Sequence, residues 1–314
     1  MIRTEEFTFD SRDGKTKLHA MRWLPEGEPV AVLQIIHGMN EYIRRYDAFA
    51  AYMAERGFVV VGEDHLGHGE SVSEGGTYGY FCDNDPATVV VRDVHRLKKL
   101  TQQDYPTLPY LILGHSMGSF ILRNYITRYG TGISGAIICG TGTPKKSQLL
   151  GGKLLTVILE KLKGDTYVSK LVNEMSTKAY MSGEGMETEL DWLCSDRAVQ
   201  EAYAKDPLCS GFTFIRLISC ANGMGRFCIR CSIRAWYIWC FTSSPIIMYM
   251  LSERKVISDA VYRYYFSPLK CLLGRFCNLR RFLHFPISKY LRFQRQGLKN
   301  NLLMGTKTFT HFFE

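Results

Sequence analysis

The stretch Tyr110-Leu-Ile-Leu-Gly114-His-Ser116-Met-Gly118 decides the fold, because it joins three patterns in a few residues. Its first four residues form an apolar run that predicts a buried β-strand, and helical spacing follows as far as about Tyr129. Between them, a serine flanked by glycines makes a turn too tight for side chains at its flanks and raises the hydroxyl above the sheet. The helix start behind it offers backbone N–H groups to a developing negative charge. The pattern therefore predicts that Ser116 is a nucleophile in a strand-to-helix elbow.

Strands and helices alternate along the chain on both sides of this elbow. Apolar β-rich runs predict strands at Val30–Ile36, Phe58–Val61, Tyr110–Leu113 and Gly135–Cys139. Helical spacing predicts helices at about Tyr46–Arg56, Pro86–Gln103 and Gly118–Tyr129. This alternation indicates an α/β fold, a mostly parallel doubly wound sheet with helices on both faces. In such sheets the functional residues collect at the carboxyl ends of the strands.

Two other strand-ending turns have unusual sequences. One is His37-Gly-Met-Asn-Glu41, directly after Val30–Ile36, and the other is Asp64-His-Leu-Gly-His-Gly-Glu-Ser71. Together with Gly-His-Ser-Met-Gly, the three motifs stand in the order and at the spacing of one branch of the α/β-hydrolases. From about residue 5 to residue 213, the chain resembles the monoacylglycerol lipase and lysophospholipase branch, the serine aminopeptidase-like group. The resemblance implies an α/β-hydrolase fold and ester or amide cleavage.

The resemblance also implies roles for the first turn and for the start of the helix behind Ser116. The backbone N–H groups of Met39 and Met117 are expected to form the oxyanion hole. Asn40 and Glu41 are expected to brace the loop rather than to react.

The loop from Asp64 to Ser71 shapes the floor of the site in this branch and is not catalytic. We therefore expect structural roles for its motif residues, which are Asp64, Gly67, Gly69 and Ser71. His65 and His68 raise the alternative of a metal site, but no carboxylate or cysteine has matching spacing. A structural role is the favoured interpretation, and no metal is expected.

Three regions follow from the resemblance and from composition. They are a hydrolase core over residues 1–143, a helical cap over 144–210, and an anomalous basic, Cys- and aromatic-rich segment over 211–314. Within the cap, Leu154, Ile158 and Leu162 have helical spacing, which more often marks core-facing positions than lipid contacts.

The acid and the histidine that should follow the nucleophile are not recognisable in the sequence. In this fold they come after the serine, each in a turn at the end of a strand. Asp259 and His284 have the right order but the wrong contexts, so they are interpreted as incidental residues. The last strands of the sheet are predicted to be missing or replaced. Weak or absent turnover is therefore expected.

Several hypotheses compete for residues 215–314. Of the 39 basic and 30 acidic residues, 15 basic and 3 acidic lie in residues 221–314, a bias favouring translation out of frame. A membrane tether at the uncharged run Ala235–Ser252 is the second hypothesis. A zinc module is a weaker hypothesis, because the second pair of its four candidate cysteines is badly spaced. Binding of the basic, aromatic tail to a nucleic-acid phosphate backbone is also weaker, because no nucleic-acid motif is present. The zinc module would use Cys228, Cys231, Cys271 and Cys277.

The sequence thus favours a serine hydrolase of lipid-like carboxylic esters, which forms an acyl-enzyme at Ser116 without a cofactor. The alternatives are a catalytically inactive hydrolase fold that acts as a binding protein, and a membrane-tethered hydrolase. No basic and apolar leader opens the chain, so a cytoplasmic location is expected. The acyl chain, the leaving group and the oligomeric state do not follow from the sequence.

Overall fold

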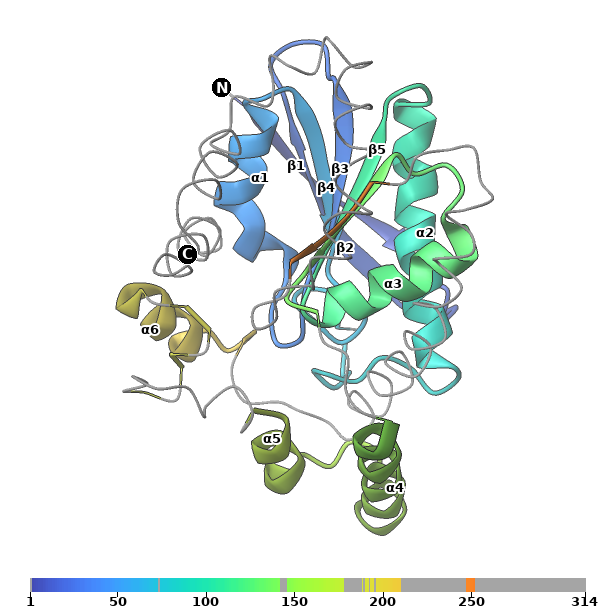
Figure 1. The fold of residues 1–314 in the computed structure, drawn as a ribbon, viewed down its shortest axis with the longest axis vertical. Coiled ribbons are helices and arrows are strands. Elements are labelled where there is room, and N and C mark those ends of the chain that lie inside the picture. The colour runs from blue at the N-terminus through green and yellow to red at the C-terminus, as the bar shows by residue number, and fades with distance from the viewer. Residues whose placement is uncertain are drawn as a thin grey trace, which may run out of the picture. The chain divides into compact units, whose positions relative to one another are not determined.

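The computed structural model describes residues 2–72, 74–141, 146–177, 188, 190–191, 193–194, 196–209 and 247–251 (Figure 1). The chain divides into two compact units, Met1–Leu251 and Ser252–Glu314, and every described residue belongs to the first. The strands are β1 Arg3–Asp10, β2 Lys17–Leu24, β3 Ala31–Ile36, β4 Phe58–Glu63, β5 Tyr110–His115, β6 Gly135–Cys139 and β7 Ile247–Leu251. The helices are the 3-10 helix η1 Ile43–Tyr46, then α1 Asp47–Ala54, α2 Pro86–Asp104, α3 Met117–Tyr129, α4 Lys146–Lys163, α5 Lys170–Thr177 and α6 Arg197–Lys205.

The strands form one sheet in the order β1-β2-β4-β3-β5-β6-β7. The β1–β2 and β2–β4 pairs are antiparallel, whereas β4, β3, β5, β6 and β7 run parallel to one another. The strand order reverses at β3, since β4 lies on one side of it and β5 on the other. The turns that follow β3, β4 and β5 therefore leave the sheet at the same edge. This topology confirms the predicted α/β fold and brings the three sequence motifs together.

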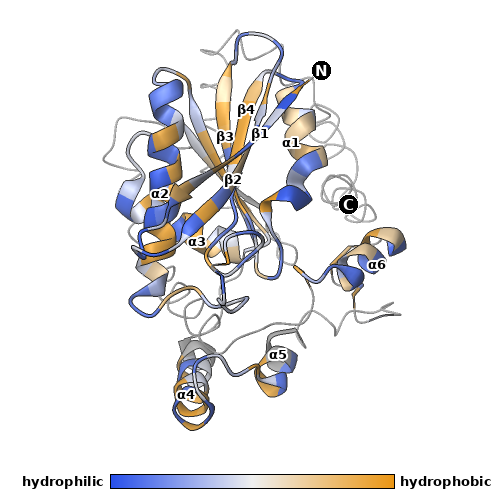
Figure 2. Cartoon of the chain, turned by 180° about the vertical axis from the view of Figure 1, so that it is seen from behind, coloured by the Kyte–Doolittle hydropathy of each residue, from blue (hydrophilic) through white to orange (hydrophobic). Residues whose placement is uncertain are grey.

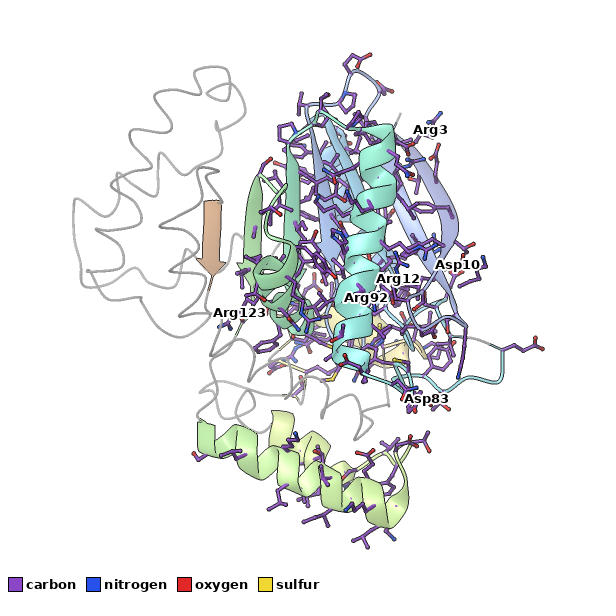
Figure 3. All side chains as sticks on the ribbon, turned by 90° about the vertical axis from the view of Figure 1, so that its right-hand side faces the viewer. Arg3, Asp10, Arg12, Asp83, Arg92 and Arg123 are labelled. Carbon is purple, nitrogen blue, oxygen red and sulfur yellow. The ribbon has the colours of Figure 1, made fainter. Side chains whose placement is uncertain are left out.

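Helices cover both faces of the sheet and bury its centre. Helix α1 lies on one face, and α2 and α3 lie on the other (Figure 1). In Figure 3, α2 lies in front of the sheet. All residues of β3, and all of β4 except its first, are buried, and both strands are mainly apolar (Figure 2). Burying a Val, Leu or Ile side chain contributes about 1.5–3 kcal/mol. The continuous apolar runs in the sequence are therefore central strands with no solvent-facing side.

The helix predicted at Tyr46–Arg56 begins differently in the structure. Instead of a helix from Tyr46 to Arg56, the chain forms η1 and then α1. The indole Nε1–H of Trp23 donates to Asp47 Oδ1 at 2.7 Å, which ties the first residue of α1 to β2. The helix ends before Gly57, whose φ of +86° favours glycine.

The edge of the sheet beyond β6 corrects the prediction for the C-terminal segment. Strand β7 pairs in parallel with β6, from Ile247 beside Gly135 to Leu251 beside Cys139. At least one late strand is therefore present. It belongs to the uncharged run Ala235–Ser252, so the described part of the proposed membrane tether is a strand. No helix in the described part of the chain is long and apolar enough to cross a bilayer.

A buried carboxyl group ends β4. Glu63 is 0% exposed, and neither of its side-chain oxygens has a hydrogen-bond partner among the described residues. Burial, reinforced by the neighbouring Asp64 charge, raises the pKa of Glu63 to about 8. A carboxylic acid with a raised pKa stabilises the fold fully only below its unfolded-state pKa, and that contribution is lost as the pH rises through the folded-state value.

We therefore expect the free energy of unfolding to fall less steeply between pH 5 and pH 8 in Glu63→Gln than in the wild type. The difference in slope is at most about 1.4 kcal/mol per pH unit. Urea denaturation across this range measures it, with the exposed Glu55→Gln as the control. Equal slopes in the wild type and Glu63→Gln would show that Glu63 ionises freely in the folded protein.

Candidate active site

Ser116 stands in a strained turn between β5 and α3, as the elbow motif predicted. Its backbone has φ +49° and ψ −115°, a conformation that a residue with a side chain rarely adopts. The surrounding structure holds it there, because the Ser116 N–H donates to Cys139 O at 3.0 Å. The Ser116 carbonyl accepts from the Ser119 N–H at 3.0 Å and from the Ser119 hydroxyl at 2.5 Å. Ser116 itself is half-buried.

The two glycines of the elbow are required by close packing against backbone. A Cβ atom at Gly114 would lie 2.5 Å from the carbonyl oxygen of Gly118. A Cβ atom at Gly118 would collide with the carbonyl oxygens of Ile36 and His37, which end β3 and begin the next turn. Backbone cannot move aside as the end of a flexible side chain can. The elbow therefore sits directly against the turn from His37 to Glu41.

The predicted oxyanion donors lie in these two adjoining turns. A Cβ atom at Gly38 would lie 3.2 Å from Ser116 Cβ, so the loop after β3 approaches the nucleophile closely. The Gly38 N–H donates to Glu41 Oε1. The next N–H in the chain, that of Met39, has no acceptor among the described residues. The Met117 N–H opens α3 and has no partner within the helix. Met39 and Met117 therefore stay the predicted pair.

Glu41 joins the two turns through one carboxylate oxygen. Its Oε1 accepts from the Gly38 N–H, from the Tyr46 hydroxyl at 2.9 Å and from His115 Nδ1–H at 3.0 Å. Burial alone would raise the pKa of Glu41, but the charge and hydrogen bond of His115 outweigh it and bring the pKa to about 2. Glu41 is therefore ionised at neutral pH, and it braces the loop as the sequence suggested.

A buried histidine beneath the loop completes the brace. His37 Nδ1–H donates to Gly38 O at 2.7 Å, and its Nε2 accepts from the His65 N–H at 3.0 Å. Burial, together with the neighbouring His65 and His68, holds the pKa of His37 well below its usual range. The neutral ring can therefore keep Nε2 as an acceptor and link the turns after β3 and β4.

The loop after β4 is held by the Asp64 carboxylate. Its two oxygens accept from the Ile43 N–H at 2.7 Å, the Glu70 N–H at 2.9 Å and His19 Nδ1–H at 2.9 Å. Gly69 has φ +49°, and a Cβ atom there would collide with this carboxylate. These contacts are structural, which fits the expectation for this motif.

His65 and His68 are also buried within this loop. Burial lowers the pKa of each to about 4. One group of three potential ligands, Glu6, His19 and Glu70, occurs among the described residues, and it contains neither histidine. Arg44 already lies 2.8 Å from Glu6 and 3.9 Å from Glu70, so ion pairs account for this group.

The base and acid for Ser116 are not among the residues that these contacts connect. In the described part of the chain, no side chain hydrogen-bonds the Ser116 hydroxyl. Asp259 and His284 lie outside the described residues, as do Cys228, Cys231, Cys271 and Cys277.

A family model for serine aminopeptidase, S33, matches residues 27–232. The chain belongs to this family. The matched range covers most of residues 5–213, over which the sequence resembles this family, and extends to residue 232.

Curated relatives and solved structures agree with this family. Rat monoglyceride lipase is 28% identical over 203 residues, which are 63% of this chain and 61% of the relative. A monoacylglycerol lipase of Mycolicibacterium smegmatis is 35% identical over 118 residues, 38% of this chain and 40% of the relative. A carboxyl esterase from Bacillus coagulans, solved in complex with glycerol, is 32% identical with a TM-score of 0.64, covering 71% of this chain and 73% of that one. The chain thus spans about three-fifths of the length of the rat relative.

Helix α6 and the residue after it contact the segment that follows the turn from His37 to Glu41. The Tyr42 hydroxyl, next to Glu41, donates to Asp206 Oδ2 at 2.8 Å. The Arg45 guanidinium lies 5.0 Å from the ring centre of Tyr203 in α6. The end of α6 therefore packs against the segment that follows the brace.

The expectation for α4 was wrong. Leu154, Ile158 and Leu162 are 63%, 45% and 72% exposed, so they do not face a core. Helical spacing in the sequence shows which residues share a face, but it does not show whether that face is covered.

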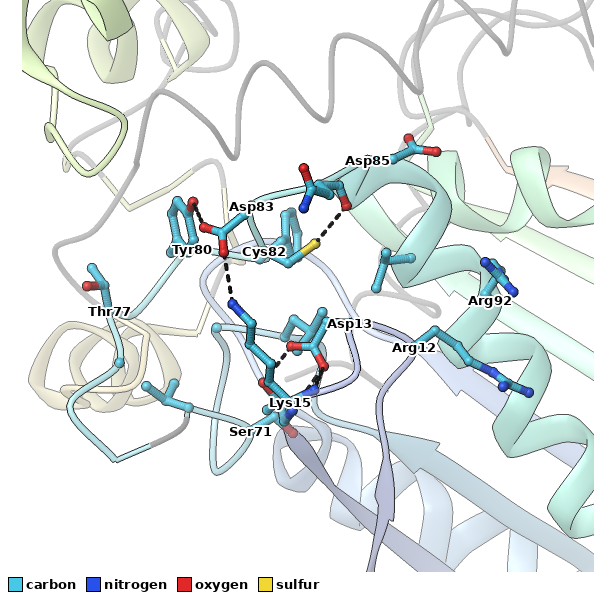
Figure 4. A pocket seen from close by; sticks show the side chains of 18 of the residues that line it. Arg12, Asp13, Lys15, Ser71, Thr77, Tyr80, Cys82, Asp83, Asp85 and Arg92 are labelled. Atoms are coloured by element: carbon cyan, nitrogen blue, oxygen red, sulfur yellow. Dashed lines mark hydrogen bonds and ion pairs between the residues drawn. The ribbon is translucent and has the colours of Figure 1, made fainter.

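A separate polar cavity of about 380 Å³ lies between the β1–β2 turn, the loop after β4 and the start of α2 (Figure 4). Lys15 pairs with Asp83 at 3.0 Å beside it, and Arg12 and Arg92 line another wall. Neither Ser116 nor a predicted oxyanion donor lines this cavity, so it is not the site of the reacting carbonyl.

Substitution Gly118→Ala should destabilise the protein by about 3 kcal/mol, because the added methyl group meets two backbone carbonyls. Thermal unfolding measures this loss. Gly151→Ala in α4 is the matched control, since nothing lies within 4 Å of its new methyl group. Equal destabilisation by both changes would contradict the close approach of the two turns.

Substitution Glu41→Gln should slow the reaction of Ser116 with a fluorophosphonate on the order of 10- to 100-fold, because the amide holds both turns less firmly. Tyr46→Phe, which removes one donor, should have a smaller effect. Labelling rates measure both. A Glu41→Gln rate equal to that of the wild type would show that the brace does not position the elbow.

Proposed function

We propose that this chain is a carboxylic ester hydrolase that acts on lipid-like esters of the monoacylglycerol or lysophospholipid type. The observation that carries the proposal is the strained Ser116 elbow, placed against a turn in which the Met39 N–H has no acceptor among the described residues. The printed names of relatives, which are monoglyceride and monoacylglycerol lipases, support the choice of ester. So does the carboxyl esterase similarity in the solved structures.

The proposed reaction begins with attack of the Ser116 hydroxyl oxygen on the ester carbonyl carbon. The carbonyl oxygen becomes an oxyanion, which the N–H groups of Met39 and Met117 stabilise. The hydroxyl proton passes to a histidine and then to the leaving alcohol as the carbon–oxygen bond of the ester breaks. A water oxygen then attacks the acyl-enzyme carbonyl carbon and gives its proton to the histidine. The bond between the acyl carbon and the Ser116 oxygen breaks, that proton returns to Ser116, and the carboxylic acid leaves.

The activity of this chain depends on a base outside the described residues. Without a base, a serine hydroxyl is a poor nucleophile. Only the oxyanion hole and substrate binding then accelerate the reaction, by about a thousandfold over the rate in water. We therefore expect slow turnover. Fast turnover would favour Asp259 and His284 as the acid and the base.

Reaction with a fluorophosphonate tests the proposal, because the probe labels an activated serine and ignores an inert one. We expect slow labelling of the wild type, loss of labelling in Ser116→Ala, and no change in Ser147→Ala, which alters an exposed serine of α4. Mass spectrometry of the labelled peptide identifies the site. A wild type that stays unlabelled would favour the second candidate, an inactive hydrolase fold that binds a ligand.

We further propose a cytoplasmic location. We also propose, from the family resemblance and from composition, a hydrolase core over residues 1–143, a helical cap over 144–210 and an anomalous basic segment over 211–314. Translation out of frame accounts for the late excess of arginine, cysteine and aromatic residues. The nucleotide sequence tests this. If its other two frames encode no strand-ending acid and no histidine turn, the frame hypothesis is wrong.

A further inference from the structure

The cavity between the β1–β2 turn, the loop after β4 and the start of α2 has the size of a ligand site. Its volume of about 380 Å³ falls within the range of about 300–1,000 Å³ in which ligand pockets lie. Leu66, Phe81 and Val89 form an apolar part of its lining, and all three are buried. Charged side chains also line it (Figure 4). An apolar surface next to a few charged groups is the usual lining of a site for a small organic molecule.

Two arginines at this cavity lack a counter-charge. Arg12 from the β1–β2 turn and Arg92 from α2 both line it, and they lie near each other in Figure 3 and in Figure 4. Among the described residues, neither guanidinium takes part in an ion pair or a hydrogen bond. By contrast, Arg22 and Arg44 lie 2.6 and 2.8 Å from carboxylate oxygens. Because a guanidinium binds carboxylates through parallel N–H donors, the two arginines favour an anionic ligand.

Three acidic residues of the described chain also line the cavity, and two of them already have donors. The Asp13 carboxylate accepts hydrogen bonds within its own turn, one of them from the Lys15 N–H at 2.8 Å. Asp83 accepts from the Lys15 ammonium at 3.0 Å and from the Tyr80 hydroxyl at 2.8 Å. The third, Asp85, is exposed to solvent. These partners and the solvent offset the negative charges, so the arginines decide the preference of the cavity.

Hydrogen-bond donors at the cavity favour the same kind of ligand. Helix α2 begins there, since Asp85, Thr88 and Val89 are part of the lining, and the Asp85 side chain makes no capping hydrogen bond. The positive end of the helix dipole is therefore not capped by a side chain. Ser71 is 1% exposed and its hydroxyl accepts from the His19 N–H at 2.9 Å, whereas its hydroxyl hydrogen has no acceptor among the described residues. A ligand that carries acceptor oxygens would satisfy these donors.

We propose that this cavity binds a small aromatic carboxylate. Its carboxylate would pair with Arg12 and Arg92, and its ring would pack against the apolar lining that includes Phe81, a residue that already stacks on His68 with ring centres 5.6 Å apart. Ser116 does not line this cavity, so the ligand is separate from the ester whose carbonyl would react. The proposal goes beyond the proposed function and does not require turnover.

Isothermal titration calorimetry of the full chain with 2-naphthoate tests the role of the charge. We expect 2-naphthoate to bind about tenfold or more tightly than its uncharged analogue 2-naphthamide, because only the carboxylate can pair with the guanidinium groups. Arg12→Gln combined with Arg92→Gln should remove this preference and leave binding of 2-naphthamide unchanged. Both arginines are exposed, so thermal unfolding should confirm an intact fold.

A charge-matched variant is the control for the arginine pair. Arg3→Gln combined with Arg56→Gln removes the same net charge at exposed positions outside the cavity and should bind 2-naphthoate as the wild type does.

Acetate tests the role of the apolar lining, because it keeps the carboxylate and lacks the ring. It should bind about tenfold or more weakly than 2-naphthoate. Equal binding of the two would show that the cavity holds an anion without recognising the ring, which contradicts the proposal.

Three further results would overturn the proposal. They are a wild type that does not bind 2-naphthoate, an Arg12 and Arg92 double variant that binds it as tightly as the wild type, and a tenfold loss of binding in Ser116→Ala. The last result would place the ligand at the elbow. We expect Ser116→Ala to bind 2-naphthoate normally, so failure of this site and failure of ester hydrolysis are measured independently.

Discussion

The buried carboxylate of Glu41 is the interaction on which the candidate site depends. It receives hydrogen bonds from the loop after β3 and from the elbow after β5, two turns that are adjacent in space but more than seventy residues apart in the chain. The close approach of Gly118 to the end of β3 leaves no room for side chains between these turns. Because that contact is between backbones, a small shift of either turn would move the N–H groups relative to Ser116.

Burial raises the pKa of two carboxyl groups near the ends of the central strands, but their final pKa values lie on opposite sides of the usual value. Glu41 and Glu63 are both buried and each has a histidine nearby, but only Glu41 accepts hydrogen bonds from several donors. His115 Nδ1 lies 3.0 Å from Glu41 Oε1, whereas His65 Nδ1 lies 3.5 Å from Glu63 Oε1 and makes no hydrogen bond to it. The pKa of Glu41 is accordingly lowered to about 2, whereas that of Glu63 is raised to about 8. Desolvation is similar in both cases, so the partners decide the charge. The ionised group braces the site, and the neutral one is part of the core.

The helical segment after β6 is connected to this brace and also carries most of the exposed large hydrophobic residues among the described residues. Tyr42 follows Glu41 in the chain and donates to Asp206 at the end of α6. Helix α4 instead exposes Leu150, Leu154, Ile158 and Leu162. The contact with the core and the exposed apolar side chains therefore lie on different helices of this segment.

The sequence by itself determined the α/β fold, the Ser116 elbow and the turns that meet beside it. These features follow from local rules, since β-rich apolar runs, helical spacing and glycines at tight turns depend on neighbours in the chain. Only the tertiary structure decided that Glu41 joins two turns and that Glu63 has no hydrogen-bond partner among the described residues. It also decided that β7 pairs with β6 and that Leu154, Ile158 and Leu162 are exposed. Each of these depends on which distant element covers a residue, and a linear pattern does not contain that information.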